Sequence, residues 1–266
     1  MNKKIIVTTG RKNNELNLEL AKNAASFLNA SLVEREKAGI SALKEKYGAD
    51  LVLVAKKNEL ILETLGGELF FHPNMAHLRL KNLRLGTGDR MVEAMGLSEG
   101  MSVLDCTLGF GADAIVASFA VGENGKVVGI EKVSVIELIV RQGLANFTDD
   151  SERIIAAMRR IKTINADALD FLRQQGDNSF DVVYFDPMFR HPFLDSKSLN
   201  PLREVADKRA LTIEYINEAR RVAKRRVVMK ESSLSTEFTR LGFNRIAGGK
   251  YSKIHYGIIE KYTAGN

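Results

Sequence analysis

The sequence predicts an α/β protein in which a doubly wound, mainly parallel sheet follows a small N-terminal α/β domain. From Met101 onward, short apolar strands alternate with helical patterns, as in a parallel sheet with helices on both faces. Two later strands, Phe243–Ala247 and Ile254–Tyr262, are joined through Gly248-Gly249 and indicate an antiparallel hairpin at the end of that sheet. Residues 1–73 hold strands and helices of their own, so we expect a separate, smaller domain there.

The small domain is expected to combine short strands with two helices. Apolar residues recur with helical spacing at Leu16, Leu20 and Ala24. The expected elements are the strands Ile5–Thr9, Leu51–Ala55, Leu60–Leu65 and Leu69–Phe71 and the helices Glu15–Leu28 and Ile40–Tyr47. Residues 74–100 then bridge to the main domain, and Gly88-Asp89 is expected to cap a helix through Met91.

The main domain, residues 74–266, is expected to contain five parallel strands before the hairpin. Apolar, β-branched runs that end in turn residues indicate these strands. They are Val103–Asp105, Val127–Glu131, Ile161–Asn165, Val182–Phe185 and Arg226–Lys230. One long helix is expected over Leu202–Ala223 and a shorter one over Ser235–Gly242.

Composition limits the class of protein. Of the 266 residues, 45% are hydrophobic and 27% are charged, which suits a folded chain with a substantial core. No apolar run reaches membrane-spanning length and no secretory leader is visible, so we expect a cytoplasmic location. The one cysteine, Cys106, excludes intrachain disulfides, and four scattered histidines form no zinc pattern, so we expect no metal.

Positive charge is concentrated in the last third of the chain. The net charge is +6, and residues 181–266 carry 16 Lys and Arg against 10 Asp and Glu. The excess is densest at Arg220, Arg221, Lys224, Arg225 and Arg226. Two interpretations stay open: a solvated helix end, where cations suit the dipole, or a surface for an anionic nucleic acid.

A glycine turn after the first parallel strand predicts a nucleotide-sized site. The strand ends at Asp105, and Gly109 and Gly111 then allow the backbone to approach a ligand closely. Glu131 ends the next strand, where an acid accepts hydrogen bonds from both hydroxyls of a ribose. Asp167 follows the third strand, where an acid can accept from an adenine amino group. This set fits S-adenosylmethionine (SAM) better than NAD, and an unliganded α/β core is the alternative.

The fourth strand ends in the tetrad Asp186-Pro187-Met188-Phe189. Pro187 stiffens the turn, so Asp186 and the following carbonyl become two fixed acceptors for the hydrogens of an exocyclic amine. Phe189 offers a face on which a base can stack. Held this way, the amine directs its lone pair at the methyl group, which favours the transition state of methyl transfer. We therefore assign Asp186 and Phe189 as catalytic.

Other acceptors for the methyl group remain open. Methylation at a pyrimidine carbon requires a cysteine nucleophile, and Cys106 lies in the glycine turn instead. Methylation of a ribose 2′-hydroxyl uses a lysine, and Lys230 and Glu260 fall on the fifth and last strands, beyond Asp186. A non-catalytic RNA-binding relative and a small-molecule methyltransferase are further alternatives.

These residues resemble the RsmJ-type 16S ribosomal RNA guanine-N2 methyltransferases over residues 75 to 230. Thr107, in place of the usual first methyltransferase glycine, is typical of this family. The similar segments are Met75-Ala76-His77 with Arg79, Gly86 to Gly96, Asp105-x-Thr107-x-Gly109-x-Gly111-x-Asp113-Ala114, Asp186 to Phe189 with His191, and Arg226 to Lys230. The family usually has proline where this chain has Arg190, and Pro192 follows His191 here.

The resemblance implies a Rossmann-like, class I methyltransferase fold with SAM as cofactor. It implies cofactor contacts at Ala112, Asp113, Glu131, Lys132, Asp167, Ala168 and Asp186, which join Asp105, Thr107, Gly109 and Gly111 of the glycine turn. It also implies methylation of the 2-amino group of a guanine in 16S rRNA or the small ribosomal subunit. We expect RNA contacts from His77, Arg79, Arg190, His191 and Lys230.

Overall fold

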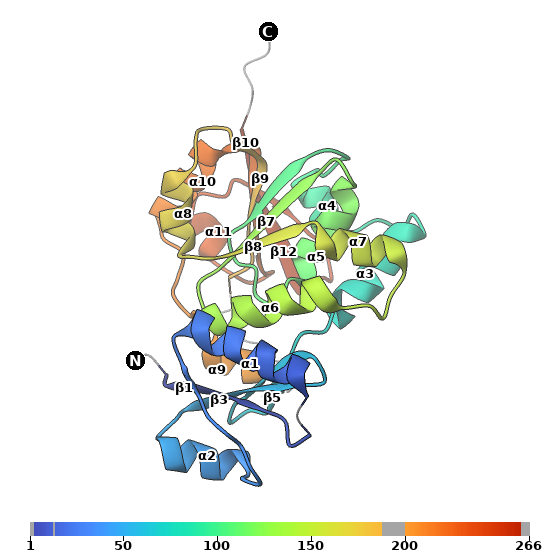
Figure 1. The fold of residues 1–266 in the computed structure, drawn as a ribbon. Coiled ribbons are helices and arrows are strands. Elements are labelled where there is room, and N and C mark those ends of the chain that lie inside the picture. Colours follow the sequence, from blue (N-terminus) through green and yellow to red (C-terminus); the bar gives the residue numbers. More distant parts are fainter. Residues whose placement is uncertain (1–2, 13, 188–199, 262–266) are drawn as a thin grey trace. The chain divides into compact units, whose positions relative to one another are not determined.

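The computed structural model describes residues 3–12, 14–187 and 200–261, and it divides into two compact units (Figure 1). The small unit contains residues 3–72, 134–146 and 200–206, and the large unit contains residues 73–133, 147–187 and 207–261. The expected boundary near residue 73 thus lies beside an observed one. However, two later segments also belong to the small unit, so the units are not two continuous stretches of chain.

The small unit has a five-stranded sheet in the order β2-β1-β3-β4-β5. β1 is parallel to β2 and β3, whereas β3, β4 and β5 pair antiparallel in sequence. The strands are β1 (Ile5–Thr9), β2 (Ser31–Leu32), β3 (Leu51–Lys56), β4 (Glu59–Glu63) and β5 (Glu68–Leu69), and the helices are α1 (Glu15–Leu28), α2 (Ile40–Tyr47), α6 (Ser134–Asn146) and α9 (Asn200–Val205). Residues 51–55 are all buried, because α1 and α2 both pack on β3.

Local signals define most of the small unit. Both expected helices and the first strand have the expected bounds. α1 begins where the Asn14 side chain accepts from the N–H of Asn17, and α2 ends at Gly48 in the left-handed conformation. The expected strand Leu69–Phe71 is instead Glu68–Leu69. β2 was not predicted, because its two exposed residues show no apolar pattern.

The large unit is built on a seven-stranded sheet in the order β11-β12-β10-β9-β6-β7-β8. Its strands are β6 (Ser102–Asp105), β7 (Lys126–Glu131), β8 (Ile161–Asn165), β9 (Phe180–Phe185), β10 (Ala223–Ser232), β11 (Arg245–Ala247) and β12 (Ile254–Glu260). Five strands are parallel, and β12 is antiparallel to both β10 and β11. This confirms the predicted parallel sheet with a terminal antiparallel hairpin.

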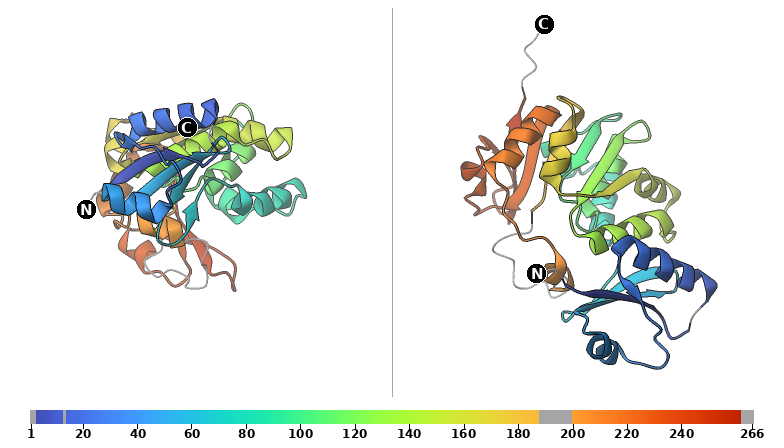
Figure 2. Two further views of the ribbon diagram at one scale, coloured as in Figure 1. Left: turned by 60° about the horizontal axis from the view of Figure 1, so that its bottom comes forward. Right: turned by 60° about the vertical axis from the view of Figure 1, so that its left-hand side comes forward.

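Helices cover both faces of this sheet (Figure 2). On one face lie α3 (Asn74–Arg84), α4 (Arg90–Met95), α5 (Ala112–Val121) and α7 (Glu152–Arg159); on the other lie α8 (Ala168–Gln174), α10 (Ile213–Val222) and α11 (Glu237–Arg240). The strands alternate accordingly: Leu104, Val183 and Met229 pack with Leu172 of α8 and Ile216 of α10 in one core. Among the described residues, no helix is long and apolar enough to cross a membrane.

The expected long helix Leu202–Ala223 is wrong. The chain forms α9 and α10 separately, with residues 206–212 between them. The Asp207 side chain accepts from the N–H of Arg209 at 3.1 Å, a local bond that competes with helix formation. Thr212 is extended and precedes α10 as its N-cap residue. The hydrophobic spacing therefore predicted one helix where the chain forms two.

Two smaller differences concern the C-terminal region. The expected helix Ser235–Gly242 is the shorter α11, and the expected strand Ile254–Tyr262 ends at Glu260, with Tyr262 outside the described residues. The carboxyl ends of β6 to β10 meet at one side of the sheet, which we call the carboxyl edge. Because parallel strands end there together, the acids that follow them lie near one another.

Candidate active site

The glycine turn lies at the carboxyl edge, between β6 and α5. Gly109 and Gly111 adopt φ values of 50° and 76°, a region that favours glycine. The N–H of Leu108 donates to the carbonyl of Ile130 at 3.0 Å, and the N–H of Gly111 donates to that of Leu108 at 2.8 Å. The turn is therefore fastened to β7, and Ala112 begins α5 directly after it.

Two buried acids, Asp105 and Glu131, flank this turn and accept hydrogen bonds from backbone N–H groups in or near it. Asp105 accepts from the N–H of Thr107 at 3.0 Å. Glu131 accepts from the N–H of Gly109 at 3.1 Å and from that of Val133 at 2.8 Å. Burial raises the pKa of Asp105 to about 8 and that of Glu131 to about 7, despite these hydrogen bonds.

Asp167 differs from Asp105 and Glu131 because two cationic side chains are hydrogen-bonded to it. Its Oδ1 accepts from the N–H of Leu169 at 2.9 Å and so caps α8, which begins at Ala168. Its Oδ2 lies 2.9 Å from Lys132 Nζ and 2.7 Å from Arg209 Nη2. Partial burial by itself would raise the pKa of Asp167. The hydrogen bonds from Arg209 and Lys132 outweigh burial and hold this pKa well below its usual range. Asp167 is thus an ionised carboxylate already engaged at both oxygens.

A second group of charges lies where β9 and β10 end, and we call it the transfer cluster: Arg79, Asp113, Tyr184, Asp186 and Lys230. Lys230 Nζ donates to Asp186 Oδ2 at 2.7 Å and to Asp113 Oδ2 at 3.0 Å. Tyr184 donates to Asp113 Oδ2 at 2.7 Å. Arg79 donates to Asp113 Oδ1. One lysine therefore joins the acid at the start of α5 to the acid at the end of β9.

Contacts outside the transfer cluster hold it in place. The N–H of Asp186 donates to Thr107 Oγ1 at 2.5 Å, which ties the end of β9 to the glycine turn. Arg79 Nε and Nη2 lie 2.7 and 2.8 Å from the two oxygens of Asp89, which also caps α4, as expected for Gly88-Asp89. The cluster thus connects α3, α4, α5, β9 and β10.

Burial and charge act against each other in the transfer cluster. Burial by itself would raise the pKa of Asp113. The charges of Lys230 and Arg79 and the hydrogen bond from the Tyr184 hydroxyl outweigh burial and hold this pKa well below its usual range. Burial, joined by the Asp113 charge, leaves the pKa of Asp186 raised even beside Lys230. Burial by itself would lower the pKa of Lys230. The negative charges of Asp113 and Asp186 outweigh burial and raise this pKa above its usual value. Lys230 is therefore a firmly protonated cation.

The expected RNA-contacting residues are separated by the structure. Lys230 and Arg79 point into the transfer cluster, and their side chains are only 17% and 22% exposed. His77 lies on α3 with its Nε2 2.5 Å from Asp150 Oδ2 and its side chain 39% exposed. Phe189, Arg190 and His191 lie outside the described residues.

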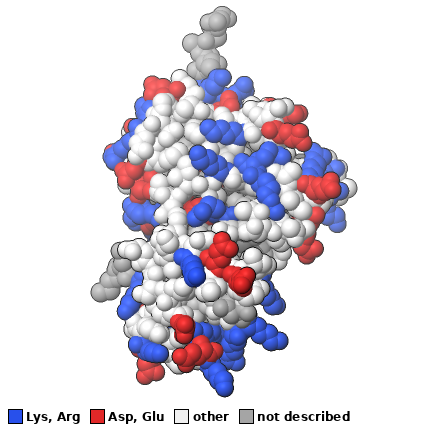
Figure 3. Space-filling model, in the orientation of Figure 1, with Lys and Arg blue, Asp and Glu red and all other residues white. Residues whose placement is uncertain are grey.

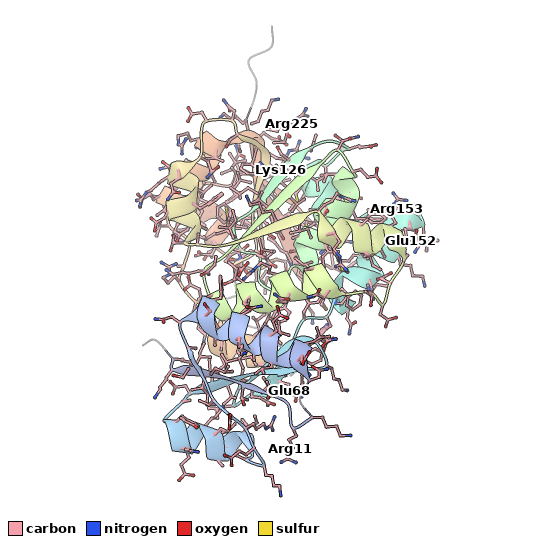
Figure 4. The ribbon with its side chains drawn as sticks, viewed as in Figure 1. Arg11, Glu68, Lys126, Glu152, Arg153 and Arg225 are labelled. Atoms are coloured by element: carbon pink, nitrogen blue, oxygen red, sulfur yellow. The ribbon has the colours of Figure 1, made fainter. Side chains whose placement is uncertain are left out.

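The arginine-rich stretch from Arg220 to Arg226 lies at the amino ends of the strands, opposite the carboxyl edge. Figure 4 shows Arg225 there together with Lys126, which begins β7. Arg221 donates to the Leu172 carbonyl at 2.9 Å, and Arg226 donates to the Ala94 carbonyl at 3.0 Å. In the view of Figure 3, Lys and Arg side chains on the large unit are interspersed with Asp and Glu. These contacts favour the interpretation without nucleic acid for this stretch.

Sequence reasoning missed two members of this site. Tyr184 was assigned only to a buried strand, and Asp89 only to a helix cap. Tyr184 is 1% exposed and holds Asp113, while Asp89 holds Arg79. A tyrosine among the aliphatic residues of β9 was the one available signal, since a buried hydroxyl requires a partner. No group of His, Cys, Asp or Glu among the described residues is arranged to hold a metal ion.

The strand order and the glycine turn with acids beyond it define a class of protein, the SAM-dependent methyltransferases of class I fold. A family model described as "Putative SAM-dependent methyltransferase" matches residues 37–244, and the chain belongs to this family. Its cofactor is therefore SAM. A Neisseria gonorrhoeae SAM-dependent methyltransferase, NGO1261, has the same fold, with a TM-score of 0.65, 18% identity and 97% of each chain covered.

Curated relatives extend this comparison. The chain is 42% identical to the Bacillus subtilis protein called Uncharacterized protein YpiP, over 96% of this chain and 99% of that one. It is also 30% identical to Ribosomal RNA small subunit methyltransferase J of Pseudomonas fluorescens, over 54% of this chain and 56% of that one. The Vibrio parahaemolyticus protein of the same name is 38% identical to this chain, over 42% of this chain and 45% of that one. The chain spans about half the length of these two methyltransferases.

The groups present at the carboxyl edge suit SAM. Two backbone N–H groups orient the oxygens of Glu131. Asp105 is 2% exposed at the end of β6, and among the described residues no cationic side chain is hydrogen-bonded to it. At Gly109 an added Cβ would meet nothing closer than the Thr107 carbonyl at 3.8 Å, so the turn leaves open space beside its backbone. Acids that lack a cation, next to an open glycine turn, fit a ligand that brings hydroxyls and a positive charge.

Proposed function

We propose that this methyltransferase acts on an exocyclic base amine, the 2-amino group of a guanine in 16S rRNA. The observation that carries this proposal is the fixed position of Asp186 before Pro187. Thr107 Oγ1 accepts from its N–H and Lys230 binds its Oδ2, so the carboxylate is held at both its backbone and its side chain. Asp186 Oδ1 and the Pro187 carbonyl are then the acceptors for the two amine hydrogens.

Two acceptors suffice for this reaction because an aromatic amine needs orientation more than deprotonation. Its lone pair is delocalised into the ring, and holding both hydrogens directs the lone pair out of the ring plane. The amine loses its extra proton readily once it has been methylated. Phe189 is proposed to stack on the base from the segment after Pro187.

SAM supplies an electrophilic methyl group carried on a positively charged sulfur. We propose that Glu131 accepts from its ribose hydroxyls and that Lys132, Asp167 and Ala168 border its adenine. The backbone around Thr107, Gly109, Gly111 and Ala112 would lie against the rest of the molecule, with Asp105, Asp113 and Asp186 supplying negative charge nearby. Asp167 would have to exchange Arg209 or Lys132 for the adenine amino group.

Transfer to an amine is favoured over transfer to a ribose hydroxyl. A 2′-hydroxyl must lose its proton, and a lysine that assists must itself be neutral. The two carboxylates raise the pKa of Lys230, which makes it a poor base. Glu260 is distant from Lys230, because the residue opposite Lys230 is Tyr256, four positions earlier on β12. Glu260 instead forms ion pairs with Arg245 at 2.9 Å and with Arg226 at 3.3 Å. We propose instead that Lys230 and Arg79 position Asp186 and Asp113.

The choice of 16S rRNA is supported by the relatives named Ribosomal RNA small subunit methyltransferase J, which match about half of this chain. In this proposal His77, Arg190 and His191 contact RNA near the target base. The small ribosomal subunit and its free 16S rRNA are both substrates to be tested.

One experiment identifies both the substrate and the methylated atom. Purified protein is incubated with isotopically labelled SAM and either free 16S rRNA or small subunits from a strain that lacks the gene. The RNA is digested to nucleosides and analysed by mass spectrometry. N2-methylguanosine that carries the label is the expected product. Labelled 2′-O-methylnucleosides would instead establish the ribose reaction, and no label in either RNA would exclude this substrate.

A further inference from the structure

The loop between β11 and β12 presents an aromatic side chain and an aliphatic neighbour to solvent. Tyr251 is 90% exposed and Leu234, in the segment after β10, is 91% exposed. The N–H of Ser233 donates to the carbonyl of Lys253 at 3.0 Å, which joins the two segments. Both side chains are exposed on segments that are hydrogen-bonded to each other, so both are available for contact with a ligand.

The loop is a short, braced turn. The N–H of Ser252 donates to the Gly249 carbonyl at 2.9 Å, which places Lys250 and Tyr251 at the two central positions of a β-turn. Ser252 Oγ donates to the Ile254 carbonyl at 2.8 Å and fixes the return into β12. An added Cβ on Gly249 would come within 2.6 Å of Arg90, so the guanidinium of Arg90 lies directly against the turn.

One cation lies near the tyrosine ring, and two others lie on or against the loop. Lys250 Nζ lies 5.6 Å from the centre of the Tyr251 ring, and Lys250, Lys253 and Arg90 are all exposed. An aromatic face with cations about it is the arrangement by which proteins bind single-stranded nucleic acid. Bases stack on the ring, and the charges lie near the phosphates.

The loop lies on the substrate side of the sheet. Ser232, the last residue of β10, pairs with Ile254, and the loop continues past that pair beyond the carboxyl edge. Tyr256 pairs with Lys230 of the transfer cluster, and Tyr251 is five residues further along. At roughly 3.4 Å per residue, the backbone of Tyr251 is within about 17 Å of Tyr256, and Lys230 lies about 5 Å from Tyr256 on the adjacent strand. A few nucleotides of single-stranded RNA span that distance.

We propose that Tyr251, with Leu234 and the cations Lys250 and Arg90, forms a stacking platform for single-stranded RNA next to the methylated guanine. This inference rests on the proposed function, because it assumes that the substrate is RNA. The platform binds a base that flanks the target, so it contributes to RNA affinity and leaves SAM binding and the methyl-transfer step unchanged.

The test compares Tyr251→Ala and Tyr251→Phe with wild type. With the RNA that wild type methylates, Tyr251→Ala should raise KM about tenfold, or ~1.4 kcal/mol, and leave kcat within about twofold. Tyr251→Phe keeps the stacking face and should keep KM. Leu65→Ala, which removes a side chain 89% exposed in the small unit, is the matched control and should have no effect. The dissociation constant of SAM, measured by calorimetry, should be the same for all four proteins.

Binding of a fluorescent single-stranded oligoribonucleotide taken from the methylated region gives a second readout. Lys250→Ala should weaken it and reduce its dependence on salt, whereas Lys37→Ala, at an exposed site of the small unit, should not. A wild-type KM for Tyr251→Ala would overturn the platform while leaving RNA methylation intact. If wild type methylates no RNA, the proposed function fails, and the platform fails with it.

Discussion

Two pairs of acids share the carboxyl edge of one sheet and are treated in opposite ways. Asp105 and Glu131, beside the glycine turn, accept hydrogen bonds from the turn and from the backbone, and burial raises the pKa of both. Asp113 and Asp186, in the transfer cluster, share the ammonium of Lys230. Among the described residues, no Lys or Arg side chain is hydrogen-bonded to the first pair, whereas Lys230 is bonded to both members of the second.

Under the proposed function, this difference would separate a cofactor-binding site from a reacting site. Carboxylates that lack a cation are costly to ionise when buried, but an incoming ligand with a positive charge and hydroxyl donors reduces that cost. Carboxylates that share an internal lysine are already oriented before any substrate arrives: Asp113 is ionised, and the pKa of Asp186, although burial raises it to about 6, stays below neutral pH. We infer that the first pair is adapted to SAM and that the second presents a fixed acceptor to the amine.

The largest effect is expected from Asp186→Ala. Loss of the proposed amine acceptor should lower kcat by about 100- to 1000-fold, because the interaction is made in the transition state. Methyl transfer to RNA from labelled SAM measures this, and calorimetry should show SAM affinity within a few-fold of wild type. Unaltered turnover would exclude the role given to Asp186 and would remove the functional half of the comparison.

Asp113→Asn should cause the largest loss of stability. The substitution keeps the shape of the side chain but removes the charge that faces Lys230 and Arg79. Because it leaves buried cations with less compensation, the free energy of unfolding should fall by about 3 kcal/mol in a urea titration. Asp170→Asn, whose carboxylate is 64% exposed in its pair with Arg173, is the control and should unfold like wild type. Equal stability of the two variants would show that the transfer cluster is not internally compensated.

The pH dependence of SAM binding tests the first pair. With the pKa of Glu131 raised to about 7, the carboxyl is mostly protonated at pH 6 and mostly ionised at pH 8. An ionised carboxylate accepts from both ribose hydroxyls, so SAM should bind about tenfold more weakly at pH 6 than at pH 8. Calorimetry at both pH values measures this. Glu131→Gln should reduce the dependence and leave the part due to Asp105, whose pKa of about 8 lies in the same range. An affinity that is independent of pH in wild type would refute the assignment.

Substitutions at Asp167 and at its partner Arg209 test whether Asp167 binds SAM as the first pair is inferred to do. Arg209→Ala should have the smallest effect of these variants. Arg209 is 51% exposed, so Arg209→Ala should change SAM affinity by about 1 kcal/mol or less. Asp167→Asn keeps the oxygen that caps α8 but loses the charge. It should weaken SAM binding more than Arg209→Ala if the carboxylate accepts from adenine. The reverse order would make Asp167 an ion-pair and capping residue only.

Local sequence signals predicted much of the fold and the glycine-turn side of the site. β1, α1, α2 and β8 have the expected bounds, because hydrophobic spacing and capping residues act within a few positions of each other. The glycine turn and Glu131 lie where the strand ends predicted them. The break between α9 and α10 was missed, since one side-chain bond from Asp207 outweighs a continuous helical pattern.

The sequence alone determined most strands of the large sheet, the glycine turn, and the acids that follow the strands β6 to β9. It determined these because each depends on neighbouring residues. Only the tertiary structure decided that Arg79 and Lys230 face Asp113 and Asp186 rather than solvent, and that Tyr184 completes the same cluster. Those partners are 34 to 117 residues apart, and ionic contacts at such separations leave no periodic or local pattern in a single sequence.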